Sequence, residues 1–334
     1  MNYTITPEQA ASSWYEQALQ YELFAGKNSD LSSLERSSIN HPAILEYKGR
    51  ILGNRHKVSE FADWTEFLLR DFGPKSRCLS LGSGLGRVEN YLMRIGFTDR
   101  FEAIELCADE NELQQIDKSK ATVKKGDLNF TELPPERYDF VLCHGVLQHL
   151  INIEFVLDQV NKTLKPDGLL LIYEYVGETR WQFMPQRMQF LRAKFPHLTF
   201  RVPLPCEIKG FESVRSADLL GLIRVQFGES PLKGADYGGV YFPFVICSKS
   251  RNDDDLTRAI ELDMEVSQQR LLSPCYHMGV YRKSRLKACM ATPWKDEELQ
   301  AKLGPKCSLP DRLLTRLRMS RLGSAVRSAK RLLS

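Results

Sequence analysis

The residues best suited to chemistry in this 334-residue sequence begin with alternating glycines inside the stretch RCLSLGSGLGRVE, residues 77–89. Gly82, Gly84 and Gly86 follow directly on a short apolar run. Because glycine lacks a Cβ atom, its backbone can take positive φ values and can lie against a ligand. The spacing is G-x-G-x-G, which differs from the G-x-G-x-x-G turn of dinucleotide-binding folds. Taken alone, the stretch fits an ordinary turn between a strand and a helix equally well.

Two acidic residues occupy comparable places further along the chain. Glu105 ends a second apolar run, nineteen residues after Gly86, and Asp127 follows Gly126 at the end of a third. A carboxylate at the first place can accept both hydroxyl protons of a ribose, and one at the second can accept from the exocyclic amine of adenine. Either acid could instead be solvated at a strand end or cap a helix. Their joint placement beside the glycines favours a nucleoside site.

A nucleoside without phosphates explains both the acids and the short glycine spacing. A pyrophosphate would favour positive neighbours and the longer turn that leads into a helix N-terminus. An adenosine joined to an amino acid through a sulfonium brings its own positive charge, so acidic surroundings attract it. We therefore predict S-adenosylmethionine (SAM) as the cofactor. Its predicted contacts are Gly82, Ser83, Gly84, Gly86, Glu105, Leu106, Asp127, Leu128 and His144.

The elements that must position these residues alternate between strands and helices from Lys75 to Gly177. Apolar runs predict strands at 77–81, 100–106, 121–128, 138–145 and 169–175. The intervening runs predict helices at 87–97, 110–121 and 155–165. Such alternation with short loops requires crossover connections and a parallel sheet covered on both faces. The predicted fold class is therefore α/β with a Rossmann-like sheet.

After Gly177 the alternation breaks. The run 222–228 predicts a sixth strand, 275–283 a last strand, and the acidic segment 253–272 a helix. The segments 178–222 and 229–272 are too long for ordinary loops, so we expect them to form a substrate lid.

The same pattern divides the chain into three parts. Residues 1–72 have helical spacing and are expected to form an N-terminal cap. Residues 73–283 form the main domain with the two insertions, and residues 284–334 form a basic tail.

Composition excludes several classes of protein. The chain is 43% hydrophobic and 26% charged, which is typical of a globular protein, and no apolar run approaches the length of a membrane span. Its start has neither the basic nor the apolar region of a secretory signal. The 8 cysteines are scattered without a C-x-x-C pair or zinc spacing. We therefore expect a cytoplasmic protein with free thiols and no metal site.

Positive charge is concentrated near the C-terminal end. The net charge is +4, yet residues 280–334 hold fourteen Lys or Arg and four Asp or Glu, a balance of +10 that leaves −6 for the remainder. On a helix, residues 309–334 would place most basic side chains on one side and Leu or Ala on the other. This pattern fits peripheral contact with an anionic membrane, or a solvated or partner-docking helix. No nucleic-acid module accompanies the charge, so no nucleic acid is expected.

Five motifs together resemble the class I SAM-dependent methyltransferases, in order and at the spacing of that family. They read LSLGSGLGR, AIEL, KKGDL, YDFVLCHGVLQHL and LKPDGLLLIYEYVG, and they cover about residues 75–177. The resemblance implies a seven-stranded, mostly parallel sheet and methyl transfer from SAM. One departure is Ser80, because the family commonly has an acidic residue two places before the first glycine. Its loss removes one partner for the methionine amino end, which backbone carbonyls could supply.

Further motifs resemble a bacterial subgroup of that family, one that often accompanies glycan-building enzymes. They read HPAI, YVGETRWQF, SVRSADLL, DYGG and a late YRK. This narrower resemblance implies O-methylation of a saccharide or of a saccharide-bearing precursor. Two alternatives stay open: N- or O-methylation of another small metabolite, and a SAM-binding partner protein without catalysis of its own.

Methyl transfer to an alcohol needs a base, and the candidates cluster after the fourth and fifth strands. His149 or Glu174 is the predicted general base. His149 could instead only pack and hydrogen-bond at a helix start, and Glu174 could only orient the substrate. His144 is expected to form a wall of the cofactor site.

Four neighbouring residues suit a polar ring such as a sugar. Tyr175, Arg180, Trp181 and Gln182 offer a cation, flat apolar faces and an amide just beyond the fifth strand, and are the predicted substrate contacts. They could equally hold a surface loop in place.

Overall fold

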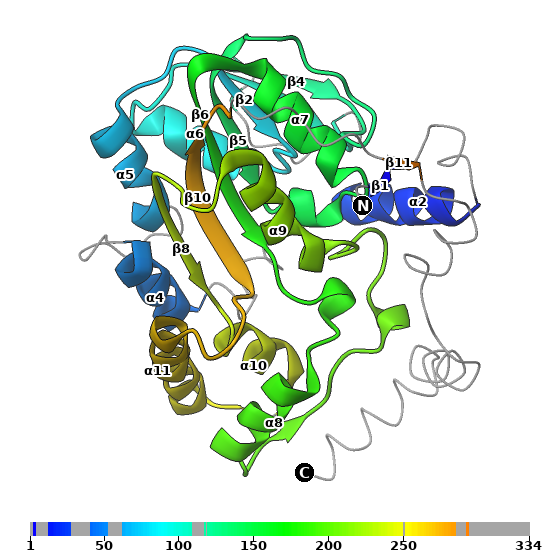
Figure 1. The fold of residues 1–334 in the computed structure, drawn as a ribbon, viewed down its shortest axis with the longest axis vertical. Helices are drawn as coiled ribbons and strands as arrows, with labels where there is room; N and C mark the ends of the chain where they lie inside the picture. The colour runs from blue at the N-terminus through cyan, green and yellow to red at the C-terminus, as the bar shows by residue number, and fades with distance from the viewer. Residues whose placement is uncertain are drawn as a thin grey trace.

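A seven-stranded sheet in the order β4-β3-β2-β5-β6-β10-β8 forms the centre of the computed structural model (Figure 1). The structure describes residues 3–4, 13–27, 41–52, 62–108, 117, 119–249, 251–284 and 292–293. The strands are β2 (Cys78–Leu81), β3 (Phe101–Glu105), β4 (Ala121–Lys125), β5 (Tyr138–His144), β6 (Leu164–Tyr175), β8 (Lys233–Tyr237) and β10 (Tyr276–Arg282). Only β10 runs antiparallel to its neighbours, β6 and β8. The predicted Rossmann-like, seven-stranded and mostly parallel α/β fold is confirmed.

Helices cover both faces of this sheet. The helices of the described residues are α2 (Ser13–Lys27), α4 (Pro42–Leu52), α5 (Ala62–Phe72), α6 (Arg87–Arg94), α7 (Ile153–Thr163), α8 (Pro185–Lys194), α9 (Ser216–Phe227), α10 (Tyr241–Cys247) and α11 (Asp253–Gln269). Short 3₁₀ turns are η2 (Leu147–His149), η3 (Thr179–Trp181) and η4 (Pro205–Glu207). Two further strand pairs join β1 (Tyr3–Thr4) to β11 (Thr292–Pro293) and β7 (Thr199–Phe200) to β9 (Ser248–Lys249).

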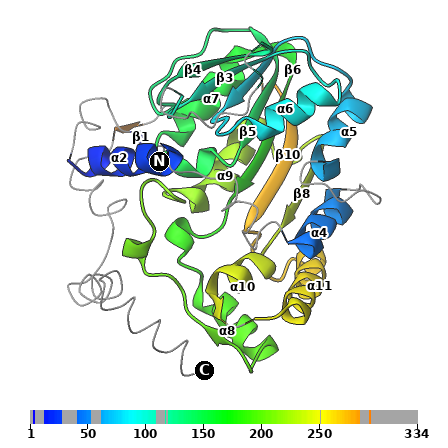
Figure 2. The ribbon, with the colours of Figure 1, turned by 180° about the vertical axis from the view of Figure 1, so that it is seen from behind.

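The alternation of apolar residues along β5 shows how the layers form. Phe140 and Leu142 pack in the cluster that contains residues of α4, α5 and α6, whereas Val141 and Cys143 pack in the cluster with α7 and α9. Successive side chains of a strand point to opposite faces, so an unbroken apolar run requires cover on both. Helices α7 and α9 lie on the near face in Figure 1, and α6 lies on the opposite face in Figure 2.

The run 222–228 was wrongly predicted as a strand, because it belongs to helix α9. Leu219 and Ile223, four residues apart, are completely buried, which is the spacing of one helix face. The sixth strand lies later, at Lys233–Tyr237. It falls within the segment 229–272, which therefore contributes to the sheet as well as to any substrate lid. The predicted helix at 110–121 lies mostly outside the described residues.

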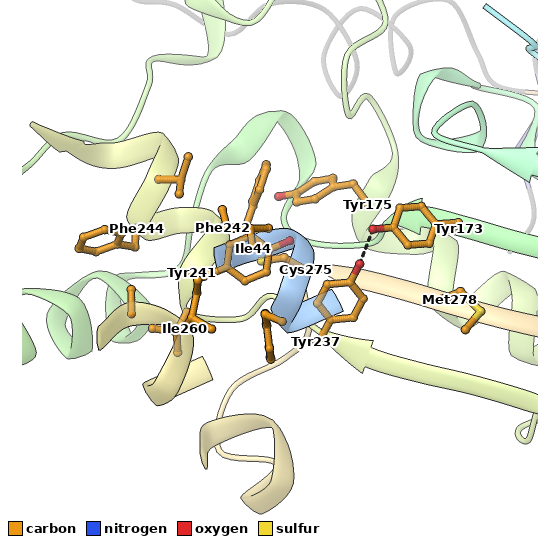
Figure 3. Packing of buried hydrophobic residues seen from close by; sticks show 14 of the residues in the cluster. Ile44, Tyr173, Tyr175, Tyr237, Tyr241, Phe242, Phe244, Ile260, Cys275 and Met278 are labelled. Carbon is orange, nitrogen blue, oxygen red and sulfur yellow. Dashed lines mark hydrogen bonds between the residues drawn. The ribbon is translucent and has the colours of Figure 1, made fainter. Parts of the chain in front are cut away.

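Aromatic side chains fill the carboxyl ends of β6 and β8. The hydroxyls of Tyr173 and Tyr237 point at each other and share a hydrogen bond (Figure 3). Tyr241 stacks on Tyr276 with the ring planes 5° apart, and Tyr175 packs on Phe242 with ring centroids 5.0 Å apart. This half of the sheet edge is therefore densely packed.

The buried carboxylate of Asp263 on α11 joins this aromatic cluster to its surroundings. It accepts hydrogen bonds from the Tyr47 hydroxyl of α4 and from the backbone amides of Gly238, Val240 and Tyr241 at the start of α10. One side chain thereby satisfies several amides that the helix start leaves without partners.

Two simpler expectations can be compared with the described part of the chain. Five cysteines of the described residues are free and buried, as expected: Cys78, Cys107, Cys143, Cys247 and Cys275. Cys206 is disulfide-bonded, which the scattered spacing of the cysteines did not predict. No helix in these ranges has both the length and the apolar character that crossing a membrane requires.

Helices α7 and α9 are joined by a buried ion pair. The Arg215 guanidinium, just before α9, donates to both carboxylate oxygens of Glu154 at 2.8 Å and to the Ile151 carbonyl at 2.6 Å. Both side chains are only 5% exposed. An unpaired charge left at such a place is costly.

Replacing Arg215→Met should lower the free energy of unfolding by about 3–5 kcal/mol, because Glu154 then stays buried without its partner. The double variant Arg215→Met/Glu154→Met should regain most of that loss. Urea denaturation of the three proteins measures both effects. A double variant no more stable than the single one would show that the ion pair is not the source of the loss.

Candidate functional site

A cavity of about 340 Å³ lies at the carboxyl ends of the parallel strands, where an open α/β sheet binds its ligands. The predicted cofactor contacts that line it are Gly82, Gly84, Glu105, Leu106, Asp127 and Leu128. The predicted base His149 lines it as well. Ser83, Gly86 and His144 are not among the lining residues.

The glycine turn forms one wall of the cavity, and two of its residues need to be glycine for different reasons. Gly82 has a φ of +66°, and a Cβ atom there would collide with Val146. Gly84 has a φ of +52°, and a Cβ atom there would meet no atom within 4 Å. The backbone at Gly84 is thus open to a ligand. The hydroxyl of Ser83, beside it, is buried and has no hydrogen-bond partner in the described structure.

The two acids that the sequence singled out both face the cavity. The Glu105 carboxylate accepts hydrogen bonds from the Gly84 amide at 2.8 Å and the Cys107 amide at 3.1 Å. The carboxylate therefore connects the end of β3 to the glycine turn of β2. The contact places Glu105 beside the glycines, as the parallel pairing of β3 with β2 leads one to expect, and its role as a ribose acceptor stays a prediction.

Helix α2 covers the Asp127 end of the cavity. The Tyr15 hydroxyl donates to Asp127 Oδ2 at 2.6 Å, and the Asn129 amide and side chain donate to Oδ1 at 2.9 and 3.0 Å. Burial, followed by the charge of Asp127, raises the pKa of Tyr15, so the phenol stays a donor. Glu22, two helical turns after Tyr15, lines the cavity and accepts from the Phe211 amide at 2.6 Å.

The electrostatics of the cavity fit a cation. Glu22, Glu105 and Asp127 all line it, whereas no lysine or arginine of the described ranges does. A pyrophosphate would find no lysine or arginine among these lining residues, while a sulfonium would meet three carboxylates. The donors and acceptors present therefore fit SAM: carboxylates for the ribose and adenine ends, and bare glycine backbone beside them.

Glu174, one of the two predicted bases, is engaged by the backbone. Its side chain is completely buried and accepts from the amides of Val146 at 2.9 Å, Leu147 at 3.0 Å and Gln148 at 3.4 Å. Burial raises the pKa of Glu174 to about 7. The three hydrogen bonds act in the opposite direction, because they favour the charged form, but burial outweighs them. Glu174 does not line the cavity but holds the η2 turn, which carries His149.

His149 stands between two carboxylates at the cavity wall. Its Nε2 lies 3.7 Å from Glu212 Oε2, and its Nδ1 lies 4.0 Å from Glu22 Oε1. Burial acts to lower its pKa, but the charges of Glu212, Glu22 and Glu174 together outweigh burial and raise it. An imidazole in this setting can take a proton from an acceptor and be stabilised as the cation.

His144 has a different environment, although it lies at the end of β5, directly before the η2 turn that carries His149. Its ring stacks on Tyr173, with centroids 5.0 Å apart. Burial, followed by repulsion from Lys48, lowers its pKa to about 4, so the imidazole is neutral at physiological pH. Its predicted role as a wall of the cofactor site stays a prediction.

The four predicted substrate contacts do not line the cavity. The polar groups of three of them bind the chain itself, whereas the indole nitrogen of Trp181 is buried without a hydrogen-bond partner among the described residues. Arg180 donates to the Gly210 carbonyl at 2.8 Å, Gln182 donates to the carbonyls of Arg180 and Pro203 at 2.9 Å, and Tyr175 donates to the Glu178 carbonyl at 3.0 Å.

Trp181 packs edge-on against Phe242, with ring centroids 6.1 Å apart. Arg180 and Trp181 have φ values of +55° and +52°, a strained pair for residues with side chains. Arg180 holds the loop that brings Phe211 to the cavity, because its guanidinium donates to the carbonyls of Gly210 and Glu212.

Several lining residues escaped the sequence reasoning. Glu22 and Phe211 come from segments far from the glycine turn in sequence, and Cys107 and Asn129 follow the predicted acids. One signal was available: Tyr15 and Glu22 are seven residues apart, which places both on one face of the predicted N-terminal helix.

Sheet order and cavity together define the architecture of a class I SAM-dependent methyltransferase. Residues 54–204, somewhat less than half of the chain, match the sequence model of a family described as "Methyltransferase domain". No curated protein matches the chain. This match indicates a methyltransferase domain, and SAM is the methyl donor that the residues of the cavity fit.

Solved structures resemble the chain only distantly. A 1,6-didemethyltoxoflavin-N1-methyltransferase from Burkholderia thailandensis is 15% identical, with 81% of this chain and 89% of that chain covered and a TM-score of 0.44. A geranyl diphosphate C-methyltransferase from Streptomyces coelicolor A3(2) is 13% identical, with 82% and 100% covered and a TM-score of 0.46. Both scores are below 0.5, so neither likeness identifies an acceptor.

Replacing Glu212→Gln should lower the pKa of His149, because the nearest carboxylate no longer stabilises the imidazolium. Proton NMR of the histidine ring signals across pH measures the shift, with His149 assigned from a His149→Gln variant. Glu207→Gln, in the same loop but paired with Arg201, is the control and should leave the signal in place. An unchanged His149 titration in Glu212→Gln would contradict the electrostatic assignment.

Proposed function

We propose that this protein transfers a methyl group from SAM to a hydroxyl of a small polar acceptor, with His149 as the general base. The observation that supports this most directly is a cavity lined by three carboxylates, with an imidazole between Glu22 and Glu212 at its wall. A saccharide or saccharide-bearing precursor is the acceptor class that the narrower sequence resemblance favours.

Three residues of the cofactor site have a definite task in this proposal. Glu105 accepts from the ribose hydroxyls, Asp127 from the adenine amine, and Gly84 presents open backbone. Bound SAM supplies an electrophilic methyl group on a sulfonium, which leaves as the neutral thioether. The chain therefore has to align the acceptor and remove its proton, and alignment alone is worth about 7–11 kcal/mol.

His149 would remove that proton. The neutral imidazole accepts it from the acceptor hydroxyl, and Glu212 and Glu22 stabilise the resulting cation. Glu174 is a positioning residue in this scheme, because its carboxylate holds the amides just before His149. Of the two bases that the sequence proposed, His149 alone lines the cavity.

Two parts of the interpretation rest on the sequence. An N-methyltransferase of a small metabolite would need no base, since a neutral amine already carries a lone pair, so the dependence on His149 separates the two reactions.

Contact of residues 309–334 with an anionic membrane stays a proposal, and so does a cytoplasmic location. This tail lies outside the described residues.

Replacing Glu105→Gln should weaken SAM binding about 10- to 100-fold, because a hydrogen bond to a charged carboxylate is worth about 1.5–3 kcal/mol. Isothermal titration with SAM measures the change. Glu102→Gln is the matched control on the same strand, since its carboxylate binds Arg137 and Tyr138. Equal affinities in all three proteins would exclude the ribose contact.

Replacing His149→Gln should reduce kcat at saturating SAM by about 10²–10⁴-fold and leave SAM affinity unchanged, because general-base catalysis is worth that factor. The acceptor for this assay is found first, by incubating the protein and labelled SAM with nucleotide-sugar, cell-envelope and small-metabolite fractions and identifying the compound that becomes labelled. His197→Gln, at a histidine paired with Asp255, should keep the full rate. A normal kcat in His149→Gln would remove the base from the mechanism and favour an amine acceptor.

A further inference from the structure

Arginines stand directly before three neighbouring strands of the sheet. Arg77 precedes β2, Arg100 precedes β3, and Arg137 precedes β5. These strands run parallel and are adjacent in the order β3-β2-β5. Because neighbouring strands lie about 4.8 Å apart, the three arginines come together at one edge of the sheet. This is the amino-terminal edge, opposite the carboxyl ends that carry the glycine turn.

A second cavity, of about 310 Å³, lies among these arginines. Its lining residues are Ser76, Arg77, Cys78, Arg100, Glu102 and Arg137. None of them lines the cavity at the carboxyl ends. The two cavities are therefore separate places on the same strands.

The charges around this second cavity do not balance. The lining has three arginines and one glutamate, a net charge of +2. Glu102 accepts from Arg137 at 2.6 Å, so this pair is neutral. Arg77 and Arg100 are exposed, and their guanidinium groups have no ion pair or hydrogen-bond partner in the part of the chain that the structure describes.

An acid next to this cavity is already engaged elsewhere. Asp139, the second residue of β5, accepts from the Lys165 ammonium at 2.7 Å and from the backbone amide of Arg77 at 3.0 Å. Its charge is matched by the lysine and not by a guanidinium. Two like charges thus face one cavity, where an anion would stabilise both.

We propose that this cavity binds the phosphate or diphosphate group of a small ligand. A guanidinium presents its N–H donors in a planar fork that matches the oxygens of a phosphate, and such charge-assisted pairs are the strong ones. Arg77 and Arg100 supply two open forks, and Arg137 is held beside them by Glu102. The volume is at the lower end of that of small-molecule sites, which favours a small ligand. The site is distinct from the proposed methyl transfer and does not rest on it.

Isothermal titration of the full chain with inorganic phosphate and with pyrophosphate, at constant ionic strength, tests this site. The wild-type protein should bind each ion saturably, one per chain. Arg77→Gln/Arg100→Gln should weaken both by at least about 10-fold, the factor for losing a hydrogen bond to a charged group. Arg50→Gln/Arg258→Gln removes the same charge from two exposed, ion-paired arginines of other helices and should bind as the wild type does.

An equal loss in the two double variants would overturn the proposal, because it would show attraction to the overall charge alone. A wild-type protein that binds neither ion would overturn it as well. The affinity for SAM, measured in parallel, should stay unchanged in Arg77→Gln/Arg100→Gln, and its loss together with that of phosphate would show general damage instead of a site.

If that double variant does not fold, Arg137→Lys still decides. It keeps a positive charge beside Glu102 but removes the fork, so it should also weaken binding of both ions. Unchanged affinity in Arg137→Lys would then refute the contact.

Discussion

The carboxylate of Glu174 is the contact on which the candidate active site depends. It ends the longest strand of the sheet, is completely buried, and accepts from three successive backbone amides at 146–148. A turn at this place would otherwise leave those amides without partners. The contact holds Val146 against Gly82, where a Cβ atom has no room, and it holds His149 at the cavity wall. The ends of β2, β5 and β6 are thereby connected, and one buried acid sets the geometry for the others.

The acids of the site form a pattern that a single function explains. Glu22, Glu105 and Asp127 line the cavity, and Glu212 faces His149. Carboxylates gathered in this way repel one another, so a positively charged ligand would stabilise the group. SAM has two positive groups, the sulfonium and the ammonium. The acids that line the cavity would offset part of this positive charge.

What could be predicted from the sequence was local. Five strands and the last strand were predictable because each is a short apolar run bounded by glycine, proline or polar residues, and the acids followed from their place at strand ends. The run LIRVQF misled because apolar residues four apart also fit a buried helix face, and periodicity cannot separate the two over so few residues. Tyr15 reaches Asp127 across 112 residues, and no local pattern encodes such a contact. The hydrogen bonds of Arg180 and Gln182 to backbone carbonyls could not be predicted either, because they too join residues far apart in the sequence.

The two histidines near the sheet edge, His144 and His149, have different pKa values because different side chains pack around them. His144 lies on the aromatic side, stacked on Tyr173 and with its pKa lowered to about 4, so it cannot exchange protons near neutral pH. His149 lies on the acidic side, where carboxylates outweigh burial and raise its pKa. The aromatic cluster fills the ends of β6 and β8, while the cavity opens beside His149, Glu22 and Phe211. In the proposed reaction the acceptor approaches along the acidic side, where helix α2 supplies part of the wall.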